Sequence, residues 1–177
     1  MFLANCKPLL VQRNVDGGHS FFRSWAEFKV GFNDTNGNYW LGNDQLHQLT
    51  INGSYKLRFD LQNRYLGSWY YAEYSRFIVS SEASNYTIQV SGYSGNAGDA
   101  FSHHNGMMFT TYDRDNDLWS SRNCATVRGG GFWYKNCGYC GVNSRFENFR
   151  WSGRLAGLGT YAAIGLRLQS TRMWLTC

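Results

Sequence analysis

Residues 55–62 of the chain, YKLRFDLQ, alternate apolar and polar side chains without interruption. The apolar positions are Tyr55, Leu57, Phe59 and Leu61, and charged residues stand between them. Because successive side chains of a strand point to opposite faces, this pattern predicts a half-buried β-strand. The same alternation recurs in residues 86–93 and 163–169, and a further apolar run covers residues 75–81. The sequence therefore predicts a sheet in which one face is covered.

Two short helices are predicted before the first of these strands. In residues 23–32, RSWAEFKVGF, Ser24 is a candidate N-cap and Glu27 completes a capping box three residues later. Gly31 is expected to end this helix. The second helix falls in residues 42–50, starts near Asn43 or Asp44, and carries leucines on one face.

Between residues 92 and 159 both periodicities nearly vanish, and glycine, asparagine, serine and aromatic residues dominate. A loop-rich region of this length inside a compact domain is usually functional. The chain has 177 residues, which suits one domain over 1–177. The expected class is α+β, with a twisted, mostly antiparallel central sheet, short helices and a loop-rich subdomain.

The composition narrows the class of partner. Charged residues make up only 16% of the chain, too few for a disordered or coiled-coil protein. The net charge is +5, but the basic residues are scattered singly, which favours a mildly basic surface over a nucleic-acid interface. The sequence contains no apolar stretch long enough to span a bilayer, and a signal peptide is not visible in it.

A cluster of acidic residues lies inside the loop-rich region, in TTYDRDNDLWSSRNC (residues 110–124). Three of the 12 acidic residues alternate here, namely Asp113, Asp115 and Asp117. Such carboxylates repel one another unless a cation or a basic group neutralises them. Calcium is one candidate, and a solvated turn neutralised by Arg114 and Arg122 is the other. An EF-hand is excluded, because Leu118 and Cys124 stand where that loop needs Gly and Glu.

The order and spacing of three stretches resemble the fibrinogen C-terminal domain, which ficolins, tachylectin-like lectins, tenascins and angiopoietins share. The first is residues 16–50, which include WLGND, the second is residues 71–125, and the third is GGGFWYKNC at 129–137. The resemblance covers about residues 10–143. Within the family, WLGND and WYKNC are most similar to the ficolin-type members. Relative to the family, the first strands and a C-terminal loop are incomplete.

The resemblance implies a calcium site in the acidic cluster. In the family this loop binds Ca²⁺ through two aspartate side chains and two backbone carbonyls. The side chains would be Asp115 and Asp117, and the carbonyls those of Trp119 and Ser121. Asp113 would be an accessory residue that orients the site or balances its charge.

The resemblance also implies a disulfide between Cys124 and Cys137. Two other interpretations of Cys124, Cys137 and Cys140 are disfavoured. The C-x-x-C spacing of Cys137 and Cys140 is typical of redox proteins but lacks their βαβ context. A zinc site with His103 or His104 would require the disulfide to be broken. The remaining cysteines are Cys6, Cys140 and Cys177, which could pair together, tether other chains or stay free.

Lectin-like members of the family bind acetylated sugars beside the calcium loop, and the candidate pocket departs from theirs. Arg128 stands where an aromatic residue is common, and Gly138 replaces a His after the second loop cysteine. The aromatic loop expected after residue 146 is missing. Trp133 and Tyr134 are retained, either as pocket walls or as core. Arg128 is expected either to bind an acidic group or to pair with an aspartate of the calcium loop.

The function implied by the resemblance is a secreted, extracellular recognition module, with no constellation for catalysis in the sequence. The first hypothesis is a lectin-like, ficolin-like pattern recognition protein of innate immunity that binds acetylated or acidic microbial glycans. The alternative is a protein–protein interaction module of the matrix or growth-factor type. Oligomers could form through regions outside this chain or through its unpaired cysteines.

Overall fold

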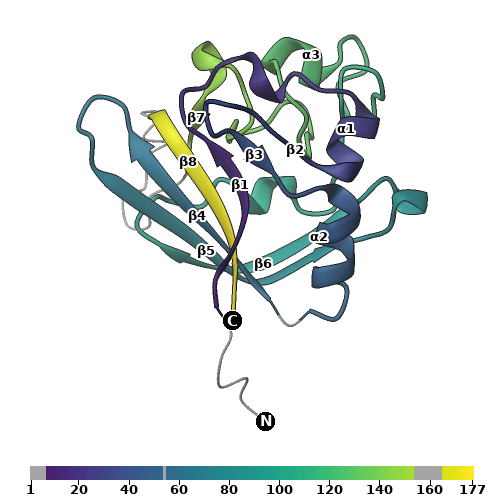
Figure 1. The fold of residues 1–177 in the computed structure, drawn as a ribbon, viewed down its shortest axis with the longest axis horizontal. Helices are drawn as coiled ribbons and strands as arrows, with labels where there is room; N and C mark the ends of the chain where they lie inside the picture. Colours follow the sequence, from purple (N-terminus) through teal and green to yellow (C-terminus); the bar gives the residue numbers. More distant parts are fainter. Residues whose placement is uncertain (1–6, 54, 154–164) are drawn as a thin grey trace.

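A computed structural model describes residues 7–53, 55–153 and 165–177. Its strands form one eight-stranded antiparallel sheet in the order β2-β3-β1-β8-β4-β5-β6, with β7 paired to β8 (Figure 1). The strands are β1 (Leu9–Asn14), β2 (Phe32–Asn33), β3 (Tyr39–Trp40), β4 (Lys56–Asn63), β5 (Trp69–Val79), β6 (Ile88–Gly95), β7 (Arg150–Trp151) and β8 (Leu166–Thr176). The predicted α+β class with a mostly antiparallel sheet is confirmed.

The helices are short and lie around the sheet. They are α1 (Trp25–Val30), α2 (Asn43–Thr50) and α3 (Cys124–Arg128), with 3-10 turns η1 (His19–Phe21), η2 (Glu82–Ser84), η3 (Ser102–His104) and η4 (Phe146–Asn148). The capping box at α1 is confirmed: the Ser24 side chain accepts from the Glu27 amide, and the Glu27 carboxylate accepts from the Ser24 amide. Gly31 is the C-cap, as expected.

The alternation at residues 55–62 is confirmed, because buried and half-buried residues alternate along the whole of β4. In β8 the parity changes midway. Leu168 is buried, whereas the next buried residues are Thr171 and Met173. The register with β4 shifts at this point, since Asn63 pairs with Leu168 and Gln62 with Ser170. A β-bulge of this kind adds one residue and turns the following side chains to the other face.

The first and the last strand lie side by side in the middle of the sheet. β1 pairs with β8, so that Leu9 faces Leu175 across the ladder (Figure 1). The sequence contained no alternation strong enough to predict β1, whose burial depends on this neighbour. One edge of the loop-rich region is tied to the sheet by β7, which pairs with β8.

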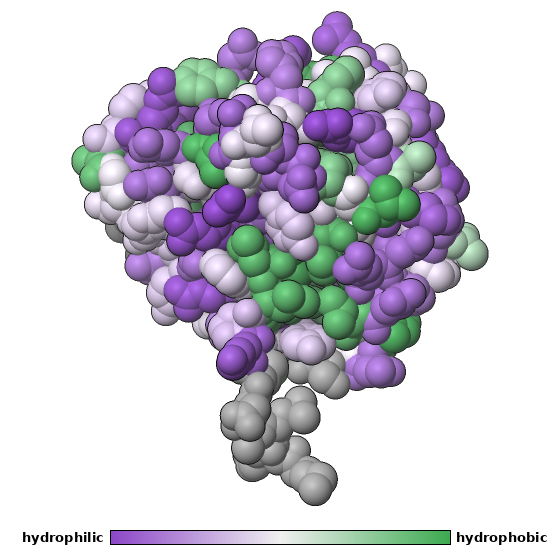
Figure 2. Space-filling model, viewed as in Figure 1, coloured by the Kyte–Doolittle hydropathy of each residue, from purple (hydrophilic) through white to green (hydrophobic). Residues whose placement is uncertain are grey.

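Aromatic side chains fill the core, which accounts for their 18% share of the sequence. The fully buried members include Trp40, Trp133, Trp151, Phe28, Phe59, Phe101 and Phe109. Many of their rings meet edge to face or tilted, at centroid distances near 5–6 Å. The face drawn in Figure 2 is mainly polar, with one apolar group of side chains between the lower ends of β1 and β8 and helix α2.

The described residues include no helix that is long and apolar enough to cross a membrane.

Candidate calcium and ligand site

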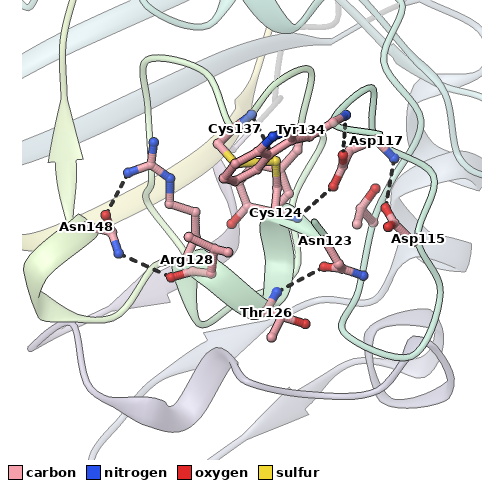
Figure 3. The surroundings of a disulfide bond; sticks show 12 residues. Asp115, Asp117, Asn123, Cys124, Thr126, Arg128, Tyr134, Cys137 and Asn148 are labelled. Carbon is pink, nitrogen blue, oxygen red and sulfur yellow. Dashed lines mark hydrogen bonds between the residues drawn. A yellow bond between two sulfur atoms is a disulfide. The ribbon is translucent and has the colours of Figure 1, made fainter. Parts of the chain in front are cut away.

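The acidic loop packs against the amino end of α3 (Figure 3). Asp117 accepts a hydrogen bond on each carboxylate oxygen, from the Trp119 amide at 2.7 Å and from the Cys124 amide at 2.7 Å. Asp115 accepts from the Asp117 amide at 3.3 Å. Asn123 caps α3 by accepting from the Thr126 amide at 3.0 Å. These contacts hold the two carboxylates next to each other.

Asp113 faces another part of the fold. Its Oδ1 accepts from the Trp25 amide in the first turn of α1 at 2.9 Å and from the Thr111 hydroxyl at 2.7 Å. A carboxylate at a helix amino terminus satisfies an unpaired amide there. The contacts of Asp113 therefore join the acidic loop to α1.

The arginines beside the cluster do not neutralise it. Arg114 donates to the Asn85 side chain at 2.7 Å, and its guanidinium lies 4.0 Å from the Trp25 ring centre. Arg122 lies over the Trp119 ring at 5.7 Å. Within the described ranges, neither Asp115 nor Asp117 takes part in an ion pair. Arg114 and Arg122 therefore do not pair directly with either carboxylate among the described residues, and the choice between calcium and a solvated turn stays a prediction.

The electrostatics of Asp117 reflect this lack of a cation. Burial raises the pKa of its carboxyl, and the charge of Asp115 raises it further, against the two amide hydrogen bonds that lower it. Asp117 is half-buried, and a carboxylate whose pKa rises in this way lacks compensating positive charge nearby. The oxygens brought together here are those of the Asp115 and Asp117 carboxylates, the type of ligand that a hard cation such as Ca²⁺ prefers. In charge and donor chemistry these two residues fit the ion.

The predicted disulfide between Cys124 and Cys137 is confirmed, with the two Cα atoms 5.2 Å apart (Figure 3). It closes a loop that contains α3 and the FWY run. The redox and zinc readings are both wrong, because Cys137 is bonded to Cys124 and Cys140 is a free, buried thiol. No group of three or more His, Cys, Asp or Glu side chains that could hold a metal occurs in the part of the chain that the structure describes.

Two of the other three cysteines lie among the described residues. Cys140 is buried, so it cannot bridge to another chain without unfolding. Cys177 is disulfide-bonded, so of the three alternatives left open by the sequence it follows pairing. Cys6 lies outside the described residues.

Trp133 and Tyr134 belong to the core and do not line a ligand pocket. Both are fully buried. The Trp133 indole donates to the Tyr86 carbonyl at 2.7 Å, and the Tyr134 hydroxyl donates to the Gly130 carbonyl at 2.7 Å. Of the two alternatives left open by the sequence, pocket walls or core, both residues follow the second, because the hydrophobic effect and these internal hydrogen bonds place both rings inside.

Position 138 needs a glycine, because the ring of His104 lies close to it. Its φ is +72°, and a Cβ at this position would lie 2.2 Å from an imidazole carbon of His104. His104 is fully buried, and its Nδ1 lies 2.6 Å from the Trp133 carbonyl oxygen. Burial lowers the pKa of His104 to about 4. Gly138 therefore makes room for a structural histidine, and it contributes no side chain to a ligand site.

Arg128 is half-buried at the end of α3 and points away from the acidic loop (Figure 3). Its Nη1 donates to the Asn148 side chain at 2.6 Å, and the Asn148 amide donates to the Val127 carbonyl at 3.4 Å. The expected alternative, a pair with an aspartate of the loop, is wrong. Asn148 lies 20 residues after Arg128 in the sequence, and no motif indicated that the two would be in contact.

Comparison with known proteins places these features in context. The family described as "Fibrinogen beta and gamma chains, C-terminal globular domain" matches residues 4–171. Fibrinogen-like protein A of Apostichopus parvimensis is 43% identical over 78% of this chain and 49% of its own length. The fibrinogen alpha chain of Homo sapiens is 46% identical over 76% of this chain and 17% of its own. The chain thus spans about half or less of these relatives.

Solved structures agree with the fold. The fibrinogen-like globe domain of human ANGPTL2 superposes with a TM-score of 0.79 and 34% identity, covering 95% of this chain and 79% of that one. Lamprey fibrin D-dimer, complexed with the peptide ligand Gly-His-Arg-Pro-amide, gives a TM-score of 0.78 at 28% identity, covering 94% and 60%.

Proposed function

Because the chain belongs to the family of fibrinogen C-terminal globular domains, we propose that it is a calcium-stabilised, secreted lectin-like domain that recognises acidic glycans. Domains of this family are non-enzymatic recognition and interaction modules. The proposal adds the ion, the class of ligand and the residues that serve them.

The observation that carries the calcium part is the uncompensated pair of Asp115 and Asp117. Burial and the neighbouring charge disfavour ionised Asp117, and no basic side chain in the described ranges pairs with either carboxylate. Ca²⁺ would be held by these two carboxylates together with the carbonyls of Trp119 and Ser121. A bound ion there would supply positive charge and make the loop rigid.

Calcium is expected to raise the melting temperature of the protein, and EDTA to lower it. At a free concentration of about 100 times Kd the ion stabilises by roughly 2.7 kcal/mol, or about 5–10 °C for a domain of this size. Asp117→Asn should remove most of this shift. Asp34→Asn is the matched control, because Asp34 also accepts backbone amides but lies outside the loop. An equal calcium shift in parent and Asp117→Asn would refute the site.

The choice of acidic over acetylated glycans follows from the side chains at the expected ligand position. Trp133 and Tyr134 are buried, so they offer no apolar wall to an acetyl group. Arg128 keeps donors beyond the single hydrogen bond to Asn148. Charge-assisted hydrogen bonds to a carboxylate or sulfate are roughly twice as strong as neutral ones.

A glycan array probed with and without calcium tests this choice. Sialylated and sulfated glycans should be retained, retention should fall as salt rises, and N-acetylglucosamine should bind weakly. Arg128→Ala should reduce the acidic signals. Calcium-dependent elution by free acetylated sugar, or full retention of acidic glycans by Arg128→Ala, would count against the proposal.

The second candidate is a protein–protein interaction module. It is favoured by the lamprey structure, which holds a short basic peptide, and by the likeness to tenascin, 42% identical over 78% of this chain in Mus musculus. An array on which no glycan binds, alongside saturable binding of an extracellular protein or peptide, would support it.

A further inference from the structure

Two hollows open beside each other where the β4–β5 turn approaches β7 and β8. One has a volume of about 340 Å³ and the other about 370 Å³, within the range of small-ligand sites. Tyr65 and Arg167 line both, so the hollows adjoin. Arg150 lines the first, and Arg64 and Phe146 line the second.

The arginines of these hollows stand together without carboxylate partners. Arg150 and Arg167 are direct cross-strand partners in the β7–β8 ladder, and the Arg64 amide donates to the Arg167 carbonyl at 2.8 Å. Like charges that face each other across a sheet are destabilising. Within the described ranges none of these three arginines forms an ion pair. The lining acid, Glu147, lies 3.9 Å from Arg145.

Arg150 is partly buried and lies in the positive electrostatic field of neighbouring arginines. Burial lowers the pKa of the Arg150 guanidinium, and the charges of Arg128 and Arg167 lower it further. Arg64 stacks on the Phe146 ring at 3.6 Å, an arrangement that holds the guanidinium plane in place and leaves its edge donors free. Arg167 donates one hydrogen bond, to the Glu147 carbonyl at 2.9 Å. An anion with several acceptor oxygens would satisfy the remaining donors.

We propose that the two hollows form one groove that binds an anionic saccharide, with Arg64, Arg150 and Arg167 holding its sulfate or carboxylate groups. Tyr65 is 76% exposed and offers an aromatic face on which a sugar ring can pack. This inference rests on the proposed function and extends it, because it adds a groove for an acidic glycan to the contact expected at Arg128.

Titration of the full chain with a sulfated disaccharide, a sialylated trisaccharide and neutral N-acetylglucosamine tests the groove. The double variant Arg150→Gln/Arg167→Gln should weaken binding of one or both acidic probes by about tenfold or more, since each lost charge-assisted bond contributes roughly that factor. Its melting temperature should stay level or rise, because a like-charge pair is relieved. The neutral sugar should bind weakly in every variant.

The matched control is Arg76→Gln. Arg76 is exposed on β5, seven residues (roughly 23 Å) from Trp69 at the turn end of that strand, and it contacts Gln89. Its substitution should change affinity less than twofold. An equal loss in Arg76→Gln would show diffuse charge attraction and overturn the groove. Tighter binding of a single-stranded oligonucleotide than of a saccharide of the same charge would also overturn the groove.

The groove and the proposed function fail in different ways. If the parent binds acidic saccharides and the double variant binds them as well as the parent, the groove is refuted while the function stands. If the parent binds no acidic saccharide, the function is refuted and the groove with it.

Discussion

Lowering the pH from 7.5 to 4.5 should destabilise the fold through one buried side chain, His104. The imidazole is fully buried, and its Nε2 has no hydrogen-bond partner among the described residues. Its Nδ1 faces the Trp133 carbonyl, so the neutral ring donates there. A proton on Nε2 would place a charge in the aromatic core with nothing to receive it.

The size of the effect follows from the two pKa values of His104. The pKa is about 4 in the folded protein, against 6.5 for an exposed histidine. Between these values the unfolded chain binds a proton that the folded chain does not, so stability falls as the pH drops below 6.5 and levels off near 4. Stability at pH 4.5 is therefore expected to be about 2.5 kcal/mol lower than at pH 7.5.

Urea unfolding followed by tryptophan fluorescence measures this loss, with His104→Asn as the comparison. The asparagine amide can donate to the Trp133 carbonyl but does not titrate. Other groups add their own pH dependence: the pKa of His103 is lowered by burial and that of Asp117 is raised by burial. Because parent and variant share these groups, the difference between their pH-induced losses reports His104.

The parent should lose about 2.5 kcal/mol more than His104→Asn between the two pH values. His19 is exposed, so His19→Asn should behave like the parent. Equal losses in the parent and in His104→Asn would refute the reasoning, because they would mean that the core accepts the charged ring.

Two further predictions concern close packing around the disulfide loop. Gly138→Ala should lower the free energy of unfolding by about 2–5 kcal/mol, since it adds left-handed strain to overpacking against His104. Gly106→Ala is the control, because φ there is +78° and no atom lies within 4 Å of the new Cβ, so only the backbone strain should lower its stability. Equal losses of unfolding free energy in the two variants would contradict the contact between residue 138 and His104. Cys140 is buried and its pKa is raised well above that of a free thiol, so iodoacetamide should modify it only in denaturant, as intact mass would show. Rapid modification of the native protein would contradict its burial.

The sequence by itself determined the features that depend on residues close along the chain. The capping box of Ser24 and Glu27 involves residues three apart, and the alternation of β4 depends only on the two-residue repeat of a strand. The family likeness likewise sufficed to predict the disulfide between Cys124 and Cys137. The cap and the alternation are specified locally, so a linear pattern contains them, whereas the disulfide was implied by the resemblance alone.

The tertiary structure decided which side chains are free to act. Asp113 bonds Trp25, 88 residues away, and Arg128 bonds Asn148 on a separate turn. Arg150 and Arg167 face each other only because β7 pairs with β8. Trp133, retained from the family motif, is buried by strands and loops far from it in sequence. Charge balance and burial depend on neighbours brought together by the fold, and no local pattern encodes them.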